Sequence, residues 1–208
     1  MNLTFIIGNG QSRSNISIDR LRDFGPVWGC NRIYKDWHVD NLVAIDQAQV
    51  ELILRDEYHT KANVYTRKRW SPLYNGVPGV NYIPEFKEEG TNKWQKQWHW
   101  NSGPLAMFVA CEQGAEILCM FGFDFYGVAG KSNNVYKGSP GYDKADHRAV
   151  DPGFWIQQFV QLAQWYPDTQ FVQVQPAGWQ VPAAWHGVSN LSIDTPETFF
   201  DTLVATDA

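Results

Sequence analysis

Short polar clusters follow several apolar stretches of the chain. Their amide, hydroxyl and carboxylate side chains can hold a small polar ligand, because amides both donate and accept hydrogen bonds and carboxylates accept them. If the apolar stretches are parallel strands, the clusters meet at the carboxyl edge of one sheet, where open α/β sheets bind their ligands. The clusters are Gly8-Asn9-Gly10, Cys30-Asn31-Arg32, Asp46, Asn101-Ser102-Gly103 and Asp124-Phe125-Tyr126.

The first cluster lies in the stretch FIIGNGQSRSN, where an apolar run ends abruptly at two glycines. It is not the dinucleotide fingerprint G-x-G-x-x-G, because Gln-Ser-Arg follows Gly10, and no Gly-Lys-Ser/Thr follows to make a P-loop. What remains is a tight turn that presents the Asn9 amide to a ligand, with Ser12 just beyond it. For this motif taken alone, a purely structural turn is the alternative.

The chain carries no recognisable metal motif. It contains no Asp-x-Asp and no set of cysteines and histidines at zinc-binding spacing. A transferase that releases a nucleoside diphosphate commonly needs a divalent ion, whereas one that releases a monophosphate can use hydroxyls and backbone N–H groups. We therefore expect chemistry of the second kind, with no metal and no separate cofactor.

Composition narrows the class of protein. The 208 residues suffice for one domain with a sizeable core. The net charge of −5, with no basic run longer than Arg67-Lys68-Arg69, argues against nucleic acid as the main ligand. Ten Trp, nine Tyr and twelve Phe indicate an aromatic core, with stacking surfaces for sugars or bases as the alternative.

The cysteines and the apolar runs indicate a compartment. Cys30, Cys111 and Cys119 form no CxxC pair and are typical of small buried residues in a reducing environment. The N-terminal run lacks the charged region of a signal peptide, and no stretch reaches the roughly 20 apolar residues of a membrane span. We expect a cytoplasmic protein that is not an integral membrane protein.

Strands and helices must position the polar clusters. Strands are predicted over residues 3–7, 27–29, 42–45, 116–122 and 171–175, with weaker ones at 63–66 and 80–83. Helices are predicted over residues 17–22, 47–54, 102–116, 151–166 and 195–205.

Caps and apolar faces support two of these helices. Ser102 is expected to cap the third helix and Asp151 the fourth, with a proline in each first turn. The fourth helix is expected to bury Phe154, Trp155, Phe159 and Leu162. The alternation of strands and helices predicts a doubly wound, mainly parallel α/β fold.

Two long segments fit this alternation badly. Residues 67–100 combine tryptophans and charges with little periodicity, and residues 126–150 are rich in Gly, Asn, Tyr, Lys and Ser. Irregular segments of this length are more often lids and binding loops than passive connections. We expect both to act as lids over the site.

The quoted motifs together resemble the bacterial sialyltransferases that use CMP-sialic acid. The matching stretches are IIGNGQS, GPVWGCNRIY, VAID and NSGPLAMFVACEQGAEILCMFGFDFY, within residues 3–126. That family shows Gly-Asn-Gly-Pro-Ser after a strand, then a Cys-Asn pair, Thr-Ser-Gly before a helix, and a strand ending Gly-Ile-Asp-Phe-Tyr. Shorter versions of these motifs also occur in proteins similar to the pterin diphosphokinases.

The resemblance implies how a CMP-sugar donor would be bound. Asn9 and Asn31 would contact the phosphate and ribose, whereas Asn101, Ser102 and Gly103 would contact the cytidine. Together with the polar clusters at the strand ends, the full expected nucleotide-binding set is Gly8, Asn9, Gly10, Ser12, Asn31, Asp46, Asn101, Ser102, Gly103 and Asp124.

The resemblance also implies catalytic roles. Tyr126 would donate its hydroxyl to the departing phosphate, and Tyr136 or Tyr142 is the nearest equivalent of the second phosphate tyrosine in the family. His147 would be the general base, since an imidazole with a near-neutral pKa can take the proton of the acceptor hydroxyl during attack. A solvated loop histidine is the alternative for His147.

The chain departs from the family pattern at several positions. Asp46-Gln47 stands where the family has Asn-Pro, Asn101 replaces the threonine of Thr-Ser-Gly, and His99 replaces an upstream arginine. An acid at position 46 would repel a phosphate unless a cation such as Arg13 or Arg32 compensates for it.

Two other functions remain open. One is a Mg²⁺-dependent phosphotransferase similar to the pterin diphosphokinases, in which Asp46 or Asp124 would hold the ion beside a nucleoside triphosphate. The other is a nucleotide-binding module without catalysis. In the main interpretation the partners are a nucleotide-sugar donor and a glycan or small-molecule acceptor. A homo-oligomer is also open.

Overall fold

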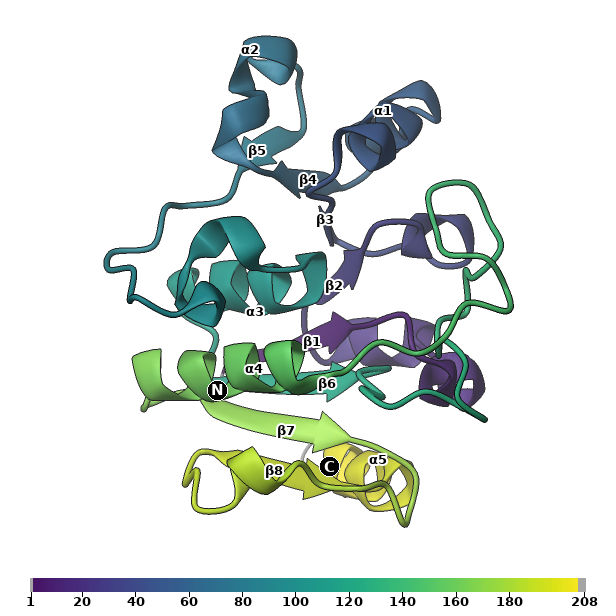
Figure 1. The fold of residues 1–208 in the computed structure, drawn as a ribbon, viewed down its shortest axis with the longest axis vertical. Helices are drawn as coiled ribbons and strands as arrows, with labels where there is room; N and C mark the ends of the chain where they lie inside the picture. Colours follow the sequence, from purple (N-terminus) through teal and green to yellow (C-terminus); the bar gives the residue numbers. More distant parts are fainter. Residues whose placement is uncertain (1, 206–208) are drawn as a thin grey trace.

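The computed structural model describes residues 2–205, and its centre is one sheet of eight parallel strands (Figure 1). The strand order is β5-β4-β3-β2-β1-β6-β7-β8. The strands are β1 Leu3–Ile7, β2 Val27–Cys30, β3 Asn41–Val43, β4 Asn63–Thr66, β5 Val80–Tyr82, β6 Ile117–Phe121, β7 Gln170–Val174 and β8 Leu191–Asp194.

The strand order reverses between β1 and β6. From β1 the chain adds strands outward to β5, and it then returns to place β6 on the free side of β1, where Leu3 pairs with Ile117 and Ile7 with Phe121. This is the doubly wound α/β arrangement that the sequence predicted. Such a reversal leaves a crevice beyond the carboxyl ends of the two strands, and ligands of this fold class bind there.

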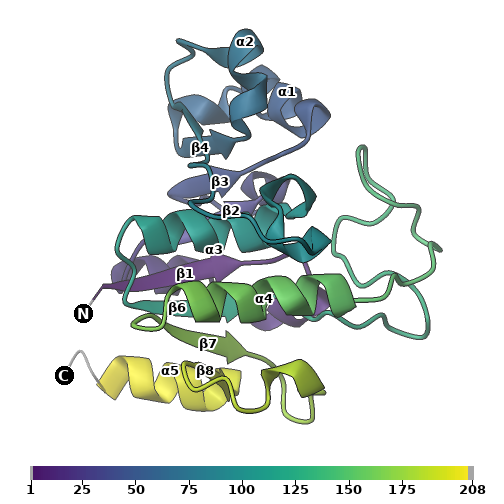
Figure 2. The ribbon, with the colours of Figure 1, turned by 60° about the vertical axis from the view of Figure 1, so that its left-hand side comes forward.

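Helices cover both faces of the sheet (Figures 1 and 2). They are α1 Gln47–Arg55, α2 Ser71–Tyr74, α3 Ser102–Glu112, α4 Gly153–Trp165 and α5 Pro196–Ala205. Ile6 of β1 belongs to the core under α3 and α4, whereas its neighbours Phe5 and Ile7 belong to the core under α1 and α5. Successive residues of a strand point to opposite faces, so β1 is apolar throughout because both of its faces are buried.

Most predicted elements are confirmed with shifts of one or two residues at their ends. The helix expected over residues 17–22 is a short 3₁₀ helix, Asp19–Asp23, and β8 was not predicted. The expected caps were wrong by one position. Asn101 holds the N-cap position of α3, and Pro152 holds that of α4, where the Asp151 carboxylate accepts a hydrogen bond from the Gly153 N–H.

The apolar faces of α3 and α4 differ from the expected ones. In α3 nearly every residue from Ser102 to Cys111 is buried, because the helix lies between the sheet and other segments. In α4, Phe159 and Leu162 are buried as predicted, whereas Phe154 and Trp155 are only half-buried. Both residues belong to the first turn of α4, and this end of the helix lies toward the carboxyl edge of the sheet (Figure 1).

The two irregular segments have different structures. Residues 67–100 contain α2, β5 and three short 3₁₀ helices. Residues 126–150 form a long excursion without helix or strand, which projects beyond the carboxyl edge of the sheet (Figures 1 and 2). Isolated bridges from Lys131 to Val128 and to Arg148 hold the base of this excursion together.

Many of the aromatic residues are packed against one another. Trp100 stacks on Trp165 with ring centroids 5.5 Å apart, and Phe86 meets both rings edge-on.

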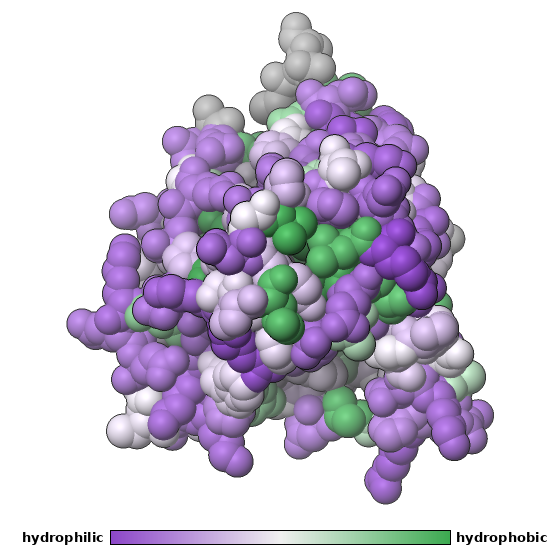
Figure 3. Space-filling view, turned by 90° about the horizontal axis from the view of Figure 1, so that it is seen from above, coloured by the Kyte–Doolittle hydropathy of each residue, from purple (hydrophilic) through white to green (hydrophobic). Residues whose placement is uncertain are grey.

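The three cysteines are buried, and none of them forms a disulfide bond. Seen from the β5 end, the surface is mainly hydrophilic around a smaller hydrophobic group (Figure 3). Within residues 2–205, none of the helices has the length and apolar character needed to cross a bilayer.

Candidate functional site

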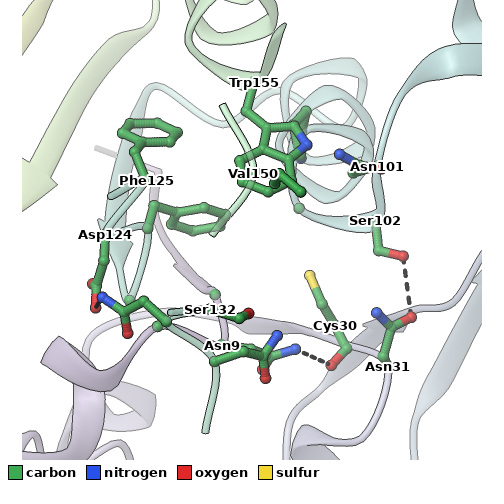
Figure 4. Close-up of a pocket in the computed structure, with 18 of the residues that line it drawn as sticks. Asn9, Cys30, Asn31, Asn101, Ser102, Asp124, Phe125, Ser132, Val150 and Trp155 are labelled. Carbon is green, nitrogen blue, oxygen red and sulfur yellow. Dashed lines mark hydrogen bonds between the residues drawn. The ribbon is translucent and has the colours of Figure 1, made fainter. Parts of the chain in front are cut away.

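A cleft of about 430 Å³ opens at the reversal point of the sheet, which is a typical size for a small-molecule site. Segments that are distant in the sequence meet here: the loops after β1, β2, β3 and β6, the start of α3 and the 126–150 excursion (Figure 4). The predicted nucleotide-binding residues that line the cleft are Gly8, Asn9, Gly10, Asn31, Asp46, Asn101, Ser102, Gly103 and Asp124.

Gly8 and Gly10 let the β1 loop lie directly against the β6 loop. Their N–H groups donate to the carbonyls of Phe121 and Gly122, at 2.7 and 2.8 Å. A Cβ on Gly8 would lie 2.5 Å from the Gly122 oxygen, and one on Gly10 would lie 2.4 Å from the Asp124 carboxyl carbon. The glycines are therefore required by this close approach, and the approach brings the Asn9 side chain to the cleft.

Asn9 reaches across the floor of the cleft. Its amide nitrogen donates to the Cys30 carbonyl at 3.4 Å (Figure 4). It also donates to the Tyr142 hydroxyl at 3.4 Å. Its side-chain oxygen is buried and has no hydrogen-bond partner among the described residues. An unpaired buried oxygen of this kind is a ready acceptor for a ligand hydroxyl or amine, because a new partner removes its desolvation penalty.

Asn31 has a left-handed backbone, with φ of +53°. Its N–H donates to the Val43 carbonyl at 3.0 Å, and its side-chain oxygen accepts a hydrogen bond from the Ser102 hydroxyl at 3.1 Å. Asparagine tolerates this conformation better than most residues, and backbone strain of this kind tends to cluster at binding sites. The hydrogen bond from Ser102 fixes the Asn31 amide at the wall of the cleft.

The first turn of α3 faces the cleft with free polar groups. Asn101 occupies the N-cap position, its side chain is exposed, and it makes no capping hydrogen bond. The N–H groups at the start of a helix lack partners within the helix, and the helix dipole makes this end favourable for negative charge. The start of α3 can therefore receive an anionic or amide-bearing part of a ligand.

Asp124 lines the cleft but is committed to holding loops together. Its carboxylate accepts from the Ser12 N–H at 3.0 Å, the Ser12 hydroxyl, Asn133 at 2.8 Å and Gln175 at 3.4 Å. Ser12 itself does not line the cleft. These four donors leave the buried carboxylate little capacity for a ligand, so Asp124 ties the β1 loop to the 126–150 excursion.

The charged groups of the cleft differ from those expected. Asp46 is exposed at the N-cap position of α1 and makes no capping hydrogen bond, and Asp143 also lines the cleft. The proposed compensating cations lie elsewhere. Arg13 is buried against Asp36 and Tyr136, and Arg32 reaches the Pro140 carbonyl.

Arg148 is the cation that lines the cleft. No motif pointed to it, because it belongs to the irregular segment and depends on the path of that segment for its position. The only signal for it is that Arg148 directly follows the histidine of the resemblance.

The three predicted catalytic residues do not line the cleft. The His147 side chain is exposed, although the His147 carbonyl accepts a hydrogen bond from the N–H of Ser132 in the cleft wall at 2.8 Å. The Tyr126 ring packs against Trp179, and burial raises the pKa of its hydroxyl. The Tyr136 hydroxyl donates to Asp36 and accepts from Arg13 at 2.8 Å, away from the cleft.

Tyr142 does not line the cleft itself, but it is the tyrosine whose hydroxyl bonds to a residue that does, Asn9. Its hydroxyl oxygen accepts from Asn9, and burial raises the pKa of Tyr142 to about 12. Hydrogen bonding to the Arg32 backbone and to the Asn31 side chain opposes part of that rise in pKa. The hydroxyl therefore stays protonated at neutral pH, at a point where several N–H donors converge.

An aromatic wall completes the cleft. It consists of Phe123, Phe125, Trp155 and Phe159, and the Phe159 ring lies edge-on to Phe123 and Phe125 at 5.4 and 5.0 Å. Trp155 lies across the cleft from Asn9 and Cys30 (Figure 4). The sequence placed Trp155 in the core, whereas it presents an aromatic face on which a base or sugar can stack.

Among residues 2–205, no group of three or more His, Cys, Asp or Glu side chains is arranged to hold a metal ion. Comparisons with family models, with curated proteins and with solved structures found no match to this chain. The case for a function therefore depends on the cleft itself.

Proposed function

We propose that the cleft binds a CMP-activated sugar and that the protein is a metal-independent glycosyltransferase resembling the sialyltransferases. The observation that carries this proposal is the meeting of Asn9, Asn31 and Asn101-Ser102 around one cleft at the reversal point of a parallel sheet. Three separate segments supply these groups, and a purely structural turn after β1 would not require the other two.

The polar and aromatic walls suggest how the donor lies. Asn9 and Asn31 hold the ribose and phosphate, and the start of α3 contacts the cytidine. Arg148 offsets the negative charge of the phosphate in a cleft that also contains Asp46 and Asp143. Trp155 stacks on an apolar face of the sugar or base.

In the reaction, the bond between the anomeric carbon and the phosphate oxygen breaks as an acceptor hydroxyl oxygen bonds to that carbon. CMP leaves with the bonding electron pair, and the developing charge on its phosphate is stabilised by hydrogen bonds and by Arg148. We assign the hydroxyl that donates to this phosphate to Tyr142 rather than to Tyr136, because only the former reaches Asn9.

His147 remains our candidate for the general base. Its neighbour Arg148 lines the cleft, and its own carbonyl bonds to Ser132 in the cleft wall. The exposed imidazole is thus attached beside the cleft lining. In the reaction it would take the proton from the acceptor hydroxyl.

Titration calorimetry with CMP, CDP and ATP, each with and without Mg²⁺, tests the class of ligand. We expect CMP to bind equally well in both conditions. Strict dependence on Mg²⁺ together with a preference for ATP would instead support the phosphotransferase. The exposed Asp46 and the nearby Asp143 are the observation that favours this second candidate.

Hydrolysis of CMP-sialic acid by the wild type and by His147→Ala tests whether catalysis occurs. We expect the wild type to release CMP and the variant to release it more slowly. Binding of CMP without hydrolysis or transfer by the wild type would indicate a non-catalytic nucleotide-binding module.

A further inference from the structure

A second concave site adjoins the nucleotide cleft at the same edge of the sheet. This site, the Trp98 groove, has a volume of about 380 Å³. It is formed by the chain after β4 and β5, by the 3₁₀ helix Gln97–His99 and by the first turn of α3. The groove residues used below are Arg67, Lys68, Arg69, Glu85, Glu89 and Trp98.

Neighbouring residues place the groove close to the cleft, and Trp70, which follows the groove residue Arg69, contacts the cleft lining. The Trp70 indole N–H donates to the carbonyl of Ile45 at 2.9 Å, and Ile45 lines the cleft. In α3, Pro104 lines the cleft and the next residue, Leu105, lines the groove. The groove and the cleft are therefore neighbours at the start of α3.

Arg69 is held between two aromatic rings. Its guanidinium carbon lies 4.1 Å from the ring centroid of Trp70 and 3.9 Å from that of Trp98. Both rings thus lie within van der Waals reach of the guanidinium, and among the described residues Arg69 makes no ion pair or hydrogen bond although its side chain is exposed. Its N–H edge is thus free and pre-oriented, which favours paired hydrogen bonds to a carboxylate or phosphate.

Arg67 anchors the segment that carries Trp98. Its guanidinium donates to the carbonyls of Gln97 at 2.9 Å and Trp100 at 2.7 Å, which fixes the backbone on both sides of Trp98. The Trp98 side chain is nonetheless 56% exposed. A large exposed aromatic ring on a fixed backbone is a stacking platform, because its position is set before any ligand arrives.

The charges of the groove distinguish between classes of ligand. Lys68 pairs with Glu85 at 3.2 Å, and Glu89 accepts from the Gln97 N–H at 2.9 Å, so two carboxylates lie beside the cations. These carboxylates would repel the repeated phosphates of a nucleic acid, but they accept hydrogen bonds from sugar hydroxyls. The C–H face of a sugar can in turn cover Trp98.

We infer that the Trp98 groove binds a saccharide that carries one anionic group, with Arg69 on the anion and Trp98 against the sugar ring. We assign the groove as the site of the acceptor sugar. That assignment rests on the proposed glycosyl transfer, whereas the binding of a saccharide does not. Uronates and sugar phosphates share the required chemistry, and the test below includes both.

The test uses the full chain and saturation-transfer NMR with four probes: a glucuronate-terminated oligosaccharide, its neutral glucose analogue, glucose 6-phosphate and a short single-stranded oligonucleotide. We expect one or both anionic saccharides to bind and the neutral analogue to bind more weakly. Equal binding of the neutral analogue, stronger binding of the oligonucleotide or no saccharide binding would overturn the inference.

Variants locate the binding. Arg69→Gln is expected to weaken binding of the anionic saccharide by about ten-fold or more, because it removes a charged hydrogen-bond donor. Trp98→Ala is expected to abolish the signal. Arg55→Gln, on the exposed surface of α1, is the matched control and should change nothing. An unchanged affinity in a folded Arg69→Gln variant contradicts the assignment.

CMP binding separates this inference from the proposed function. Neither variant should alter CMP affinity, because neither residue lines the cleft. Saccharide binding without CMP binding would leave the groove intact and remove the donor assignment. CMP binding without saccharide binding would support the donor assignment and overturn the assignment of the groove.

Discussion

The Ser102 hydroxyl donates a hydrogen bond to the side-chain oxygen of Asn31, 3.1 Å away. This bond joins the first turn of α3 to the left-handed turn after β2, and both turns line the cleft. Because the Asn31 oxygen is occupied, its amide nitrogen is directed to donate to Tyr142 or to a ligand. The bond therefore couples the orientation of the Asn31 amide to the first turn of α3.

Ser102→Ala should weaken CMP binding by about three- to ten-fold, the effect of losing one neutral hydrogen bond. The free amide of Asn31 could then rotate, and the variant also loses a hydroxyl at the cleft. Titration calorimetry measures the change. Ser192→Ala, on the exposed edge strand β8, is the control, and an equal loss of affinity in both variants would argue against the role of Ser102.

Two substitutions of Asn31 should separate its effect on the stability of the fold from its effect on CMP binding. Asn31→Ala is expected to lower the free energy of unfolding by about 1 kcal/mol or more, because alanine is strained at positive φ. Asn31→Gly removes that strain and should remain close to the wild type in urea denaturation. Both variants should lose CMP affinity, and a glycine variant with unchanged affinity would exclude the Asn31 side chain from the site.

The three tyrosines should respond differently to replacement by phenylalanine. Tyr142→Phe should reduce the rate of CMP release from the donor by about a hundred-fold, as for the loss of one donor to a developing negative charge. Its effect on KM should be small, because the hydrogen bond strengthens only as charge develops. Tyr126→Phe, which the resemblance would place in the same role, should be close to the wild type.

Tyr136→Phe should act on stability instead. Its hydroxyl joins Arg13 to Asp36, so the variant loses two hydrogen bonds to charged groups and the free energy of unfolding should fall by about 1–3 kcal/mol, although Arg13 keeps its ion pair with Asp36. Thermal denaturation together with the rate of donor cleavage distinguishes the three variants. A larger loss of rate in Tyr126→Phe than in Tyr142→Phe would reverse our assignment.

Asp46→Asn discriminates between the two candidate enzymes. In a metal-independent site the change removes a repulsive charge, and CMP should bind up to about five-fold more tightly at low salt. In a Mg²⁺-dependent site the same change removes a ligand of the ion, and ATP binding in the presence of Mg²⁺ should weaken. Calorimetry in both conditions gives opposite results for the two cases.

The buried thiols predict a loss of stability at alkaline pH. Burial raises the pKa of Cys30, Cys111 and Cys119 to about 12. In the unfolded chain a thiol has a pKa of about 8.5. Below that pH the thiols are protonated in both states, so they contribute no pH dependence to the free energy of unfolding. As the pH rises from there toward the folded pKa, only the unfolded chain loses protons, and the free energy of unfolding falls.

Urea denaturation at several pH values between about 8 and 10.5 measures this effect. Cys119→Ala, within β6, should show a shallower decline than the wild type, because one of the contributing groups is gone. Iodoacetamide should label the native thiols slowly at neutral pH, since the thiolate is the reactive form. Rapid labelling of the folded protein would contradict the raised pKa values.

The sequence predicted the sheet well where apolar runs are continuous, as in β1 and β6. It missed β8, whose sequence LSID alternates apolar and polar residues over only four positions at the sheet edge. Edge strands are buried on fewer sides, so their composition resembles that of a loop. The predicted caps of α3 and α4 failed by one residue because cap geometry depends on backbone angles that a pattern does not specify.

The site could be predicted where it depends on strand ends. Asn9 and Asn31 meet because parallel strands place the loops that follow them at one edge, and Asn101 joins them because α3, which leads into β6, begins at that edge. Arg148 and Tyr142 could not be placed in the same way. They lie in a segment whose path is set by its own turns, including left-handed Gly138 and Gly141, and no periodicity records such turns.

The pairing of Leu3 with Ile117 has a consequence for how the molecule is made. During synthesis β2 joins β1 early, but the other edge of β1 stays bare until β6 has left the ribosome. Closing such a long loop is slow, and a bare apolar edge favours association with other chains. We therefore expect the cleft, which needs the loops after both β1 and β6, to be among the last features to form.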